Sequence, residues 1–159
     1  MPHKRLLSKL HSYEMNDNII NSVTNFLTGS KYRVRVNGSY SSWAEVTCGI
    51  QQGSVLGPLL FLIYINDLID CCEKFSDFYL FADDAKLFHH LLQPGDQQIL
   101  QNRVNELVEW TWRWLLTVNI KKCLVVSFGR DVNKNFTYTI PQNNQQQIVQ
   151  LKEALLSGI

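Results

Sequence analysis

The sequence predicts an α+β domain, on three observations. Its 159 residues, 45% of them hydrophobic, can bury roughly two-thirds of the surface that the unfolded chain exposes. Helical and two-residue periodicities alternate along the chain, as they do where helices interleave with antiparallel strands. Asn37-Gly38, the favoured two-residue hairpin turn, joins two strand-like segments. We expect the domain to span residues 1–140, followed by a divergent, loosely ordered tail over 141–159 that is rich in glutamine and asparagine.

Charge and composition exclude several classes of protein. The net charge is only +1, which argues against a protein that coats nucleic acid but allows an enzyme whose basic residues gather on one face. The longest apolar run, Val55 to Ile65, has 11 residues, whereas a membrane span needs ~20, so we predict no membrane segment. The cysteines have no metal-ligand spacing, and we predict that they are buried and reduced, with no disulfide partner, in an intracellular protein (nucleus or cytoplasm): Cys48, Cys71, Cys72 and Cys123.

Two helices are predicted at the start of the chain. Residues 2–13 place three leucines on one face and three basic residues on the others, namely Leu6, Leu7 and Leu10 against Lys4, Arg5 and Lys9. Residues 16–18 form a capping cluster for the second helix, whose apolar stripe is Ile19, Ile20, Val23 and Leu27. Gly29 is a plausible stop signal for that helix.

A basic hairpin follows. From Lys31 to Asn37 the side chains alternate, so that Lys31, Arg33 and Arg35 share one side of a strand. Tyr32, Val34 and Val36 share the other side, and residues 40–48 can return as the partner strand. The basic stripe could lie along a phosphate backbone. A solvated strand face is an equally good interpretation.

The second half of the chain predicts further helices and strands. Residues 59–69, after Pro58 in the first helical turn, are apolar almost all round, so we expect that helix to be covered on most sides. Pro94-Gly95-Asp96 starts another helix, with a predicted buried stripe of Leu100, Val104, Leu107, Val108, Thr111 and Leu115. Residues 124–128 and 136–140 are strand-like.

An adjacent acidic pair, Asp83-Asp84, lies between the strand-like runs 78–81 and 85–88. Two ionised carboxylates ~4 Å apart repel by about 4 kcal/mol at an effective dielectric of 20, so such a pair favours a divalent cation. Aspartate is also a common turn residue, and the pair alone would be weak evidence of function.

A glycine-rich loop about 30 residues earlier strengthens the functional interpretation. Its glycines, Gly49, Gly53 and Gly57, permit the backbone to approach a base or sugar closely. Gln52 and Ser54 add hydrogen-bonding groups.

Loop and acidic pair together resemble the reverse transcriptase of non-LTR (LINE-type) retrotransposons. The resemblance rests on residues 49–68 followed by Phe81-Ala82-Asp83-Asp84, and on Tyr64-Ile65-Asn66-Asp67-Leu68 in particular. Residues 2–7, 31–37 and 114–123 are also similar to that family. The implied fold is a partial polymerase palm, an antiparallel sheet with helices packed on one face, that lacks the first catalytic strand, the fingers and the thumb.

The family's functional residues carry over by position. The resemblance implies that Asp83 is a Mg²⁺ ligand and Asp84 its supporting carboxylate, and that Lys122 lies near the triphosphate. Gln52, Gly53 and Ser54 would line the nucleotide and template pocket. The implied reaction is RNA-directed DNA polymerisation, a nucleotidyl transfer from deoxynucleotides to a DNA primer on an RNA template.

Three departures from the family accompany the resemblance. The upstream catalytic aspartate is expected a few residues before Pro2, Gln51 replaces a proline, and residues 145–159 drift from the family pattern. We therefore expect a truncated polymerase that is inactive alone. The alternative is a non-catalytic nucleic-acid-binding module that uses Lys31, Arg33 and Arg35. An unrelated metal-dependent hydrolase ranks last, because no supporting histidine or carboxylate cluster accompanies the acidic pair.

Overall fold

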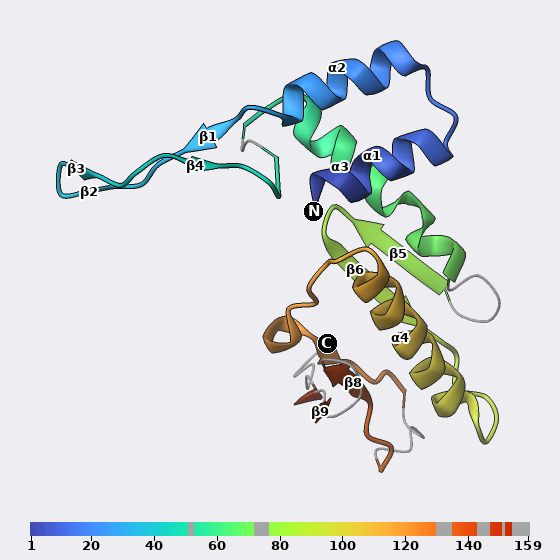
Figure 1. The fold of residues 1–159 in the computed structure, drawn as a ribbon. Coiled ribbons are helices and arrows are strands. Elements are labelled where there is room, and N and C mark those ends of the chain that lie inside the picture. The colour runs from blue at the N-terminus through green and yellow to red at the C-terminus, as the bar shows by residue number, and fades with distance from the viewer. Residues whose placement is uncertain (51–52, 72–76, 130–134, 143–146, 151, 154–159) are drawn as a thin grey trace. The chain divides into compact units, whose positions relative to one another are not determined.

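The structure, a computed structural model, describes residues 1–50, 53–71, 77–129, 135–142, 147–150 and 152–153. The chain divides into two compact units, Met1–Asn66 and Asp67–Ile159, and each is described by itself. Helices and short strands alternate along the sequence (Figure 1), which confirms the α+β class. In the described part the strands form five two-stranded ladders, four of them antiparallel and one, β7 with β10, parallel.

Three helices form the core of the first unit. Helix α1 (His3–Ser12) packs against both α2 (Asp17–Leu27) and α3 (Leu56–Ile65). The Asn16 side chain caps α2 by accepting a hydrogen bond of 2.9 Å from the backbone N–H of Asn18, as the capping cluster predicted. The buried apolar residues of these helices are Leu6, Leu10, Ile20, Val23, Leu27, Leu60, Tyr64 and Ile65.

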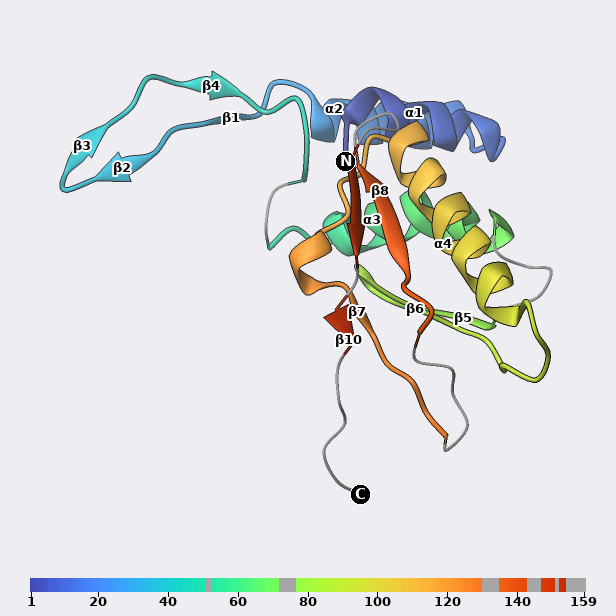
Figure 2. The ribbon, with the colours of Figure 1, turned by 90° about the horizontal axis from the view of Figure 1, so that it is seen from below.

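A long two-stranded arm joins α2 to α3. At its base β1 (Lys31–Tyr32) pairs with β4 (Ala44–Glu45), and at its tip β2 (Arg35–Val36) pairs with β3 (Ser39–Tyr40). Asn37 and Gly38 have φ angles of 48° and 86°, the left-handed pair that a type I′ turn requires. Figures 1 and 2 both show the tip of this arm well away from the three helices of its unit. The predicted hairpin is confirmed, with shorter strands than expected.

Lys9 contradicts its predicted position on an outer face of α1. Its side chain is only 1% exposed, and the ammonium group donates a hydrogen bond to the backbone carbonyl of Tyr64 near the end of α3. The same ammonium lies 5.1 Å from the centre of the Tyr64 ring. Helical spacing places Lys9 beside Leu6 and Leu10, and this carbonyl supplies the polar partner that a buried ammonium needs.

Helix α3 differs from the prediction that it is covered on most sides. Leu60 and Tyr64 are buried, but Leu59 and Leu62 are each 53% exposed. The helix then tightens into a 3₁₀ segment, Asn66–Cys71. A uniformly apolar helix has no periodic signal to show which side is covered, so its exposed leucines could not be predicted.

The second unit contains a hairpin, a long helix and several short strands. Strands β5 (Asp77–Phe81) and β6 (Asp84–Phe88) precede α4 (Asp96–Arg113) and a 3₁₀ turn, Ile120–Lys122. The remaining strands are β7 (Leu124–Val125), β8 (Thr139–Gln142), β9 (Gln147–Gln150) and β10 (Lys152–Glu153). No helix in the described residues is both long and apolar enough to cross a membrane.

Helix α4 packs against β8 through a polar side chain. The Gln101 amide donates to the carbonyl of Thr139 at 2.9 Å and accepts from the N–H of Thr139 at 2.8 Å, as a neighbouring strand would. Val108 and Thr111 of the predicted stripe are buried, but Leu115 is exposed, with a φ of 55° beyond the end of the helix. The prediction for Leu115 was wrong because α4 ends at Arg113.

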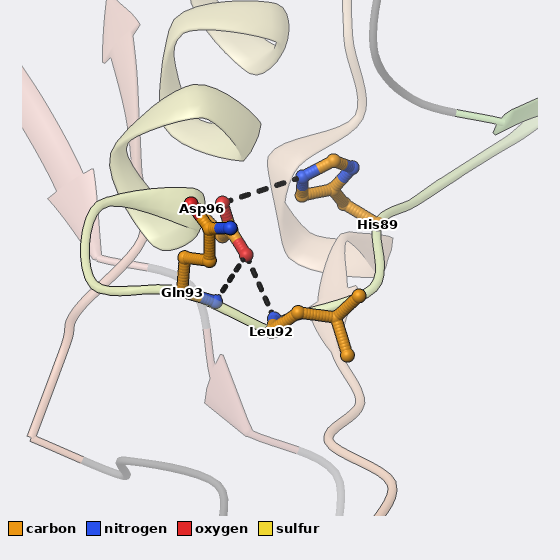
Figure 3. Close-up of polar contacts among 4 residues, drawn as sticks. All are labelled: His89, Leu92, Gln93 and Asp96. Carbon is orange, nitrogen blue, oxygen red and sulfur yellow. Dashed lines mark hydrogen bonds and ion pairs between the residues drawn. The ribbon is translucent and has the colours of Figure 1, made fainter.

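A tight turn connects β6 to α4. One carboxylate oxygen of Asp96 accepts hydrogen bonds from the backbone N–H groups of Leu92 (2.7 Å) and Gln93 (2.8 Å), and the other lies 4.0 Å from the His89 ring (Figure 3). The N–H groups of Gln93 and Leu92, and the nearby His89, lower the pKa of Asp96 because they favour its ionised form. The predicted chain break at Pro94-Gly95-Asp96 is confirmed, with Gly95 at a φ of 106°.

Candidate active site

The acidic pair lies at the end of a regular hairpin. Five cross-strand pairs join β5 and β6, from Asp77 opposite Phe88 to Phe81 opposite Asp84. Ala82 and Asp83 are therefore the two residues of the turn. Ala82 has a φ of 51°, a conformation that a residue with a side chain seldom adopts. The predicted hairpin around the two aspartates is confirmed.

The two carboxylates occupy different backbone environments. Asp83 belongs to the turn, whereas Asp84 begins β6, and both are exposed. Their oxygens are hard ligands of the kind that Mg²⁺ prefers, and Mg²⁺ commonly uses one or two carboxylates together with water and substrate oxygens. The described residues contain no group of three or more histidine, cysteine or acidic side chains that could hold a metal ion. The aspartates thus fit part of a magnesium ligand set.

The register also assigns neighbours to Asp84. Residues directly opposite share a face of a hairpin, and alternate residues of one strand do too. Asp84 therefore shares its face with Phe81 and Tyr79, both exposed, and the Tyr79 ring stacks on Phe88 with centres 5.4 Å apart. Sequence reasoning did not single out these aromatic residues, although the position of the turn would have been enough to find them.

The glycine-rich loop begins beside the start of α1. Pro2 forms an antiparallel bridge with Cys48, and the N–H of Gly49 donates to the Met1 carbonyl at 2.8 Å. The Nε2 atom of His3 lies 2.6 Å from the Gly49 carbonyl oxygen. Cys48 is exposed, contrary to the prediction that it is buried.

The structure describes two of the three predicted nucleotide-binding residues of this loop. Gln52 lies outside the described residues. Gly53 is exposed with a φ of 86°, which leaves its backbone accessible. The Ser54 hydroxyl accepts a hydrogen bond of 3.1 Å from the Gly57 N–H, so this side chain helps to start α3.

Lys122 is exposed at the end of the 3₁₀ turn Ile120–Lys122 in the second unit. Burial raises the pKa of the neighbouring Cys123 thiol, which disfavours a thiolate there. The acidic hairpin and Lys122 belong to one unit and the glycine-rich loop to the other.

The predicted basic stripe lies on the arm of the first unit. Lys31, Arg33 and Arg35 are all exposed. The Arg33 guanidinium carbon lies 3.9 Å from the centre of the Tyr40 ring and 4.6 Å from that of Trp43. Sequence reasoning assigned residues 40–48 to the return strand but did not place Tyr40 and Trp43 beside the arginines.

Comparison with known proteins identifies the family of the chain. The family model described as reverse transcriptase (RNA-dependent DNA polymerase) matches residues 1–150. The chain belongs to the reverse transcriptase family. This match includes the acidic hairpin, the glycine-rich loop and the arm.

The similar curated proteins come from mobile elements of flies. The RNA-directed DNA polymerase from mobile element jockey of Drosophila funebris is 29% identical over 133 residues, which is 79% of this chain and 14% of that protein. Probable RNA-directed DNA polymerases from transposon BS and transposon X-element of Drosophila melanogaster are each 32% identical, over 62% and 65% of this chain. The chain spans only 12–14% of the length of these relatives.

Proposed function

We propose that this chain supplies the metal-binding hairpin and nucleotide loop of an RNA-directed DNA polymerase palm encoded by a non-LTR mobile element. The observation that carries the proposal is the β5–β6 register, which sets Asp83 in the turn and Asp84 at the first residue of β6. Two exposed carboxylates are thereby held on adjacent residues at the end of a five-pair ladder, which supports a metal site there.

Each proposed site residue has one task. Asp83 binds Mg²⁺ directly and Asp84 supports it, while Gly53, Ser54 and Gln52 line the nucleotide and template pocket. Lys122 carries a positive charge near the triphosphate. When bound, the metal stabilises the negative charge that develops on the reacting phosphate oxygens.

A palm also implies partners and a place of action. The proposed substrates are an RNA template, a DNA primer and deoxynucleotides, which places the protein inside the cell, in the nucleus or cytoplasm. We further propose that the 159 residues alone are inactive, because adjacent aspartates at one hairpin tip cannot bridge two metal ions without a carboxylate from another strand.

A chimeric polymerase tests the proposal. Residues 77–88 replace the matching hairpin in the jockey polymerase, and primer extension on an RNA template is measured. The chimera should extend the primer, and Asp83→Asn in the chimera should reduce extension at least about a hundredfold, since charge stabilisation at one such site contributes roughly 2.7–4 kcal/mol. The matched control is Asp77→Asn at the far end of the same hairpin, which should leave extension unchanged. Equal losses from both substitutions would contradict a catalytic role for Asp83.

Non-catalytic nucleic-acid binding is the second candidate function. It is favoured by the arginine and aromatic cluster on the arm, which is separate in sequence from the acidic hairpin. The two functions are compatible, because a polymerase must also hold its template and primer.

A further inference from the structure

We infer that the outer part of the arm, residues 33–43, binds single-stranded nucleic acid by stacking unpaired bases on Tyr40 and Trp43 while Arg33 and Arg35 contact the phosphates. This inference deepens the proposed function, on which it rests for the class of ligand. It adds the form of the nucleic acid and two residues that the family-based expectation did not include.

A bulge brings the two aromatic residues to the arginine side of the arm. At the base of the arm Lys31 pairs with Glu45, and near the tip Arg35 pairs with Tyr40. The outgoing strand advances four residues between these two pairs, whereas the return strand advances five. The return strand therefore holds one extra residue between the two ladders, and such a bulge changes the direction of the side chains after it. Tyr40 and Trp43 both reach Arg33 as a result.

Charge on the arm suits a polyanion. The outer part carries two arginines and no acidic residue, and the one acid of the arm, Glu45, lies at its base opposite Lys31. The Arg35 guanidinium carbon is 5.3 Å from the Tyr40 ring centre, so both arginines are oriented by aromatic contacts. An arginine held in this way loses less conformational entropy when it binds a phosphate.

The exposed rings favour a single strand over a duplex. Tyr40 and Trp43 are 52% and 59% exposed although the Arg33 guanidinium already lies against both of them. An exposed ring can stack on a base only if that base is itself unstacked. The bases of a duplex are covered by their neighbours, whereas those of a single strand can be exposed. Arginines alone would bind both forms through the phosphates.

The inference is tested by fluorescence anisotropy with the full 159-residue chain and three labelled probes of equal length: oligouridylate, oligothymidylate and an RNA duplex. Trp43→Ala should weaken binding of single strands at least about fivefold, equivalent to about 1 kcal/mol, and should weaken duplex binding much less, because only Arg33 loses an aromatic contact there. Arg35→Glu should weaken all binding and reduce its dependence on salt. Loss with oligouridylate alone would identify RNA as the ligand, and equal loss with oligothymidylate would identify a site for either type of strand.

Tyr32→Ala is the matched control. Tyr32 is a similarly exposed aromatic residue, at 55%. It lies between Lys31 and Arg33 in the sequence, so its side chain is on the face of the arm opposite to the basic residues. Its replacement should leave binding unchanged, and Trp43→Phe should restore part of the lost affinity. Equal losses from Tyr32→Ala and Trp43→Ala, or the same loss with the duplex, would overturn the inference. Binding by the arm should be the same with EDTA as with Mg²⁺, so failure of the metal site can be told apart from failure of the arm.

Discussion

The buried ammonium of Lys9 makes a specific prediction about stability. Lys9→Met preserves most of the side chain's length and apolar volume but removes its charge. The Tyr64 carbonyl then loses a charged donor, and the ring of Tyr64 loses the ammonium 5.1 Å from its centre. The substitution therefore tests the polar contacts separately from the packing.

The magnitude follows from these contacts. A hydrogen bond to a charged group contributes ~1.5–3 kcal/mol, and a desolvated cation–π contact contributes ~0.5–2 kcal/mol. Removing the charge also relieves the cost of burying it, which can amount to several kcal/mol. The two contacts together contribute ~2–5 kcal/mol. Because Lys9 is 1% exposed, the relieved desolvation offsets a large part of that sum, and we expect a net destabilisation of about 1 kcal/mol.

Urea unfolding followed by circular dichroism measures this free energy. Lys4→Met makes the same chemical change at an exposed position of α1 and should alter stability by less than about 0.5 kcal/mol. If Lys9→Met were as stable as the unsubstituted chain, the contact with Tyr64 would do no more than offset the desolvation of the ammonium, and the reasoning would be refuted.

Three further substitutions test other parts of the fold. Gln101→Leu should cost about 1–3 kcal/mol in urea unfolding, because both backbone groups of Thr139 lose their partner, and a smaller loss would show that water replaces the amide. Asp96→Asn should reduce the loss of stability at acid pH. The folded pKa of Asp96 is lowered, so the stabilisation from its carboxylate is present above the unfolded value of about 4 and is lost as the pH falls through the folded pKa. Thermal unfolding between about pH 3 and 7 measures this, and an unchanged pH profile in Asp96→Asn would contradict it. Ala82→Gly should raise the free energy of unfolding by about 0.5 kcal/mol, because the relief of left-handed backbone strain (~1 kcal/mol) exceeds the cost of the added entropy of the unfolded chain. The control Ala85→Gly, which relieves no such strain, should lower the free energy of unfolding.

Local signals in the sequence predicted most of the elements that carry the proposed function. Asn37-Gly38 fixes a two-residue turn, and from that turn alone Tyr40 follows as the partner of Arg35. The strand-like runs on either side of Asp83-Asp84 likewise predicted the acidic hairpin. Such features depend on residues close in sequence, which explains why they could be predicted.

Features that depend on distant partners could not be predicted in this way. Trp43 reaches Arg33 only through a bulge, which has no composition signal here. Lys9 and Gln101 look like surface residues of amphipathic helices until the backbone groups that receive them, at Tyr64 and Thr139, are known. The burial of α3 was also overestimated, because the sequence of an all-apolar helix does not show which face is packed.

The central claim is that Asp83 and Asp84 form a metal-binding site, and paramagnetic broadening by Mn²⁺ tests it most directly. Backbone amide signals of the chain are recorded by NMR during a Mn²⁺ titration, with Asp83→Asn and Asp77→Asn variants in parallel. The account predicts that broadening begins at residues 82–85 of the hairpin, persists in Asp77→Asn and is lost in Asp83→Asn. Broadening that is equal at all aspartate and glutamate residues of the chain, or that is unchanged in Asp83→Asn, would contradict the account.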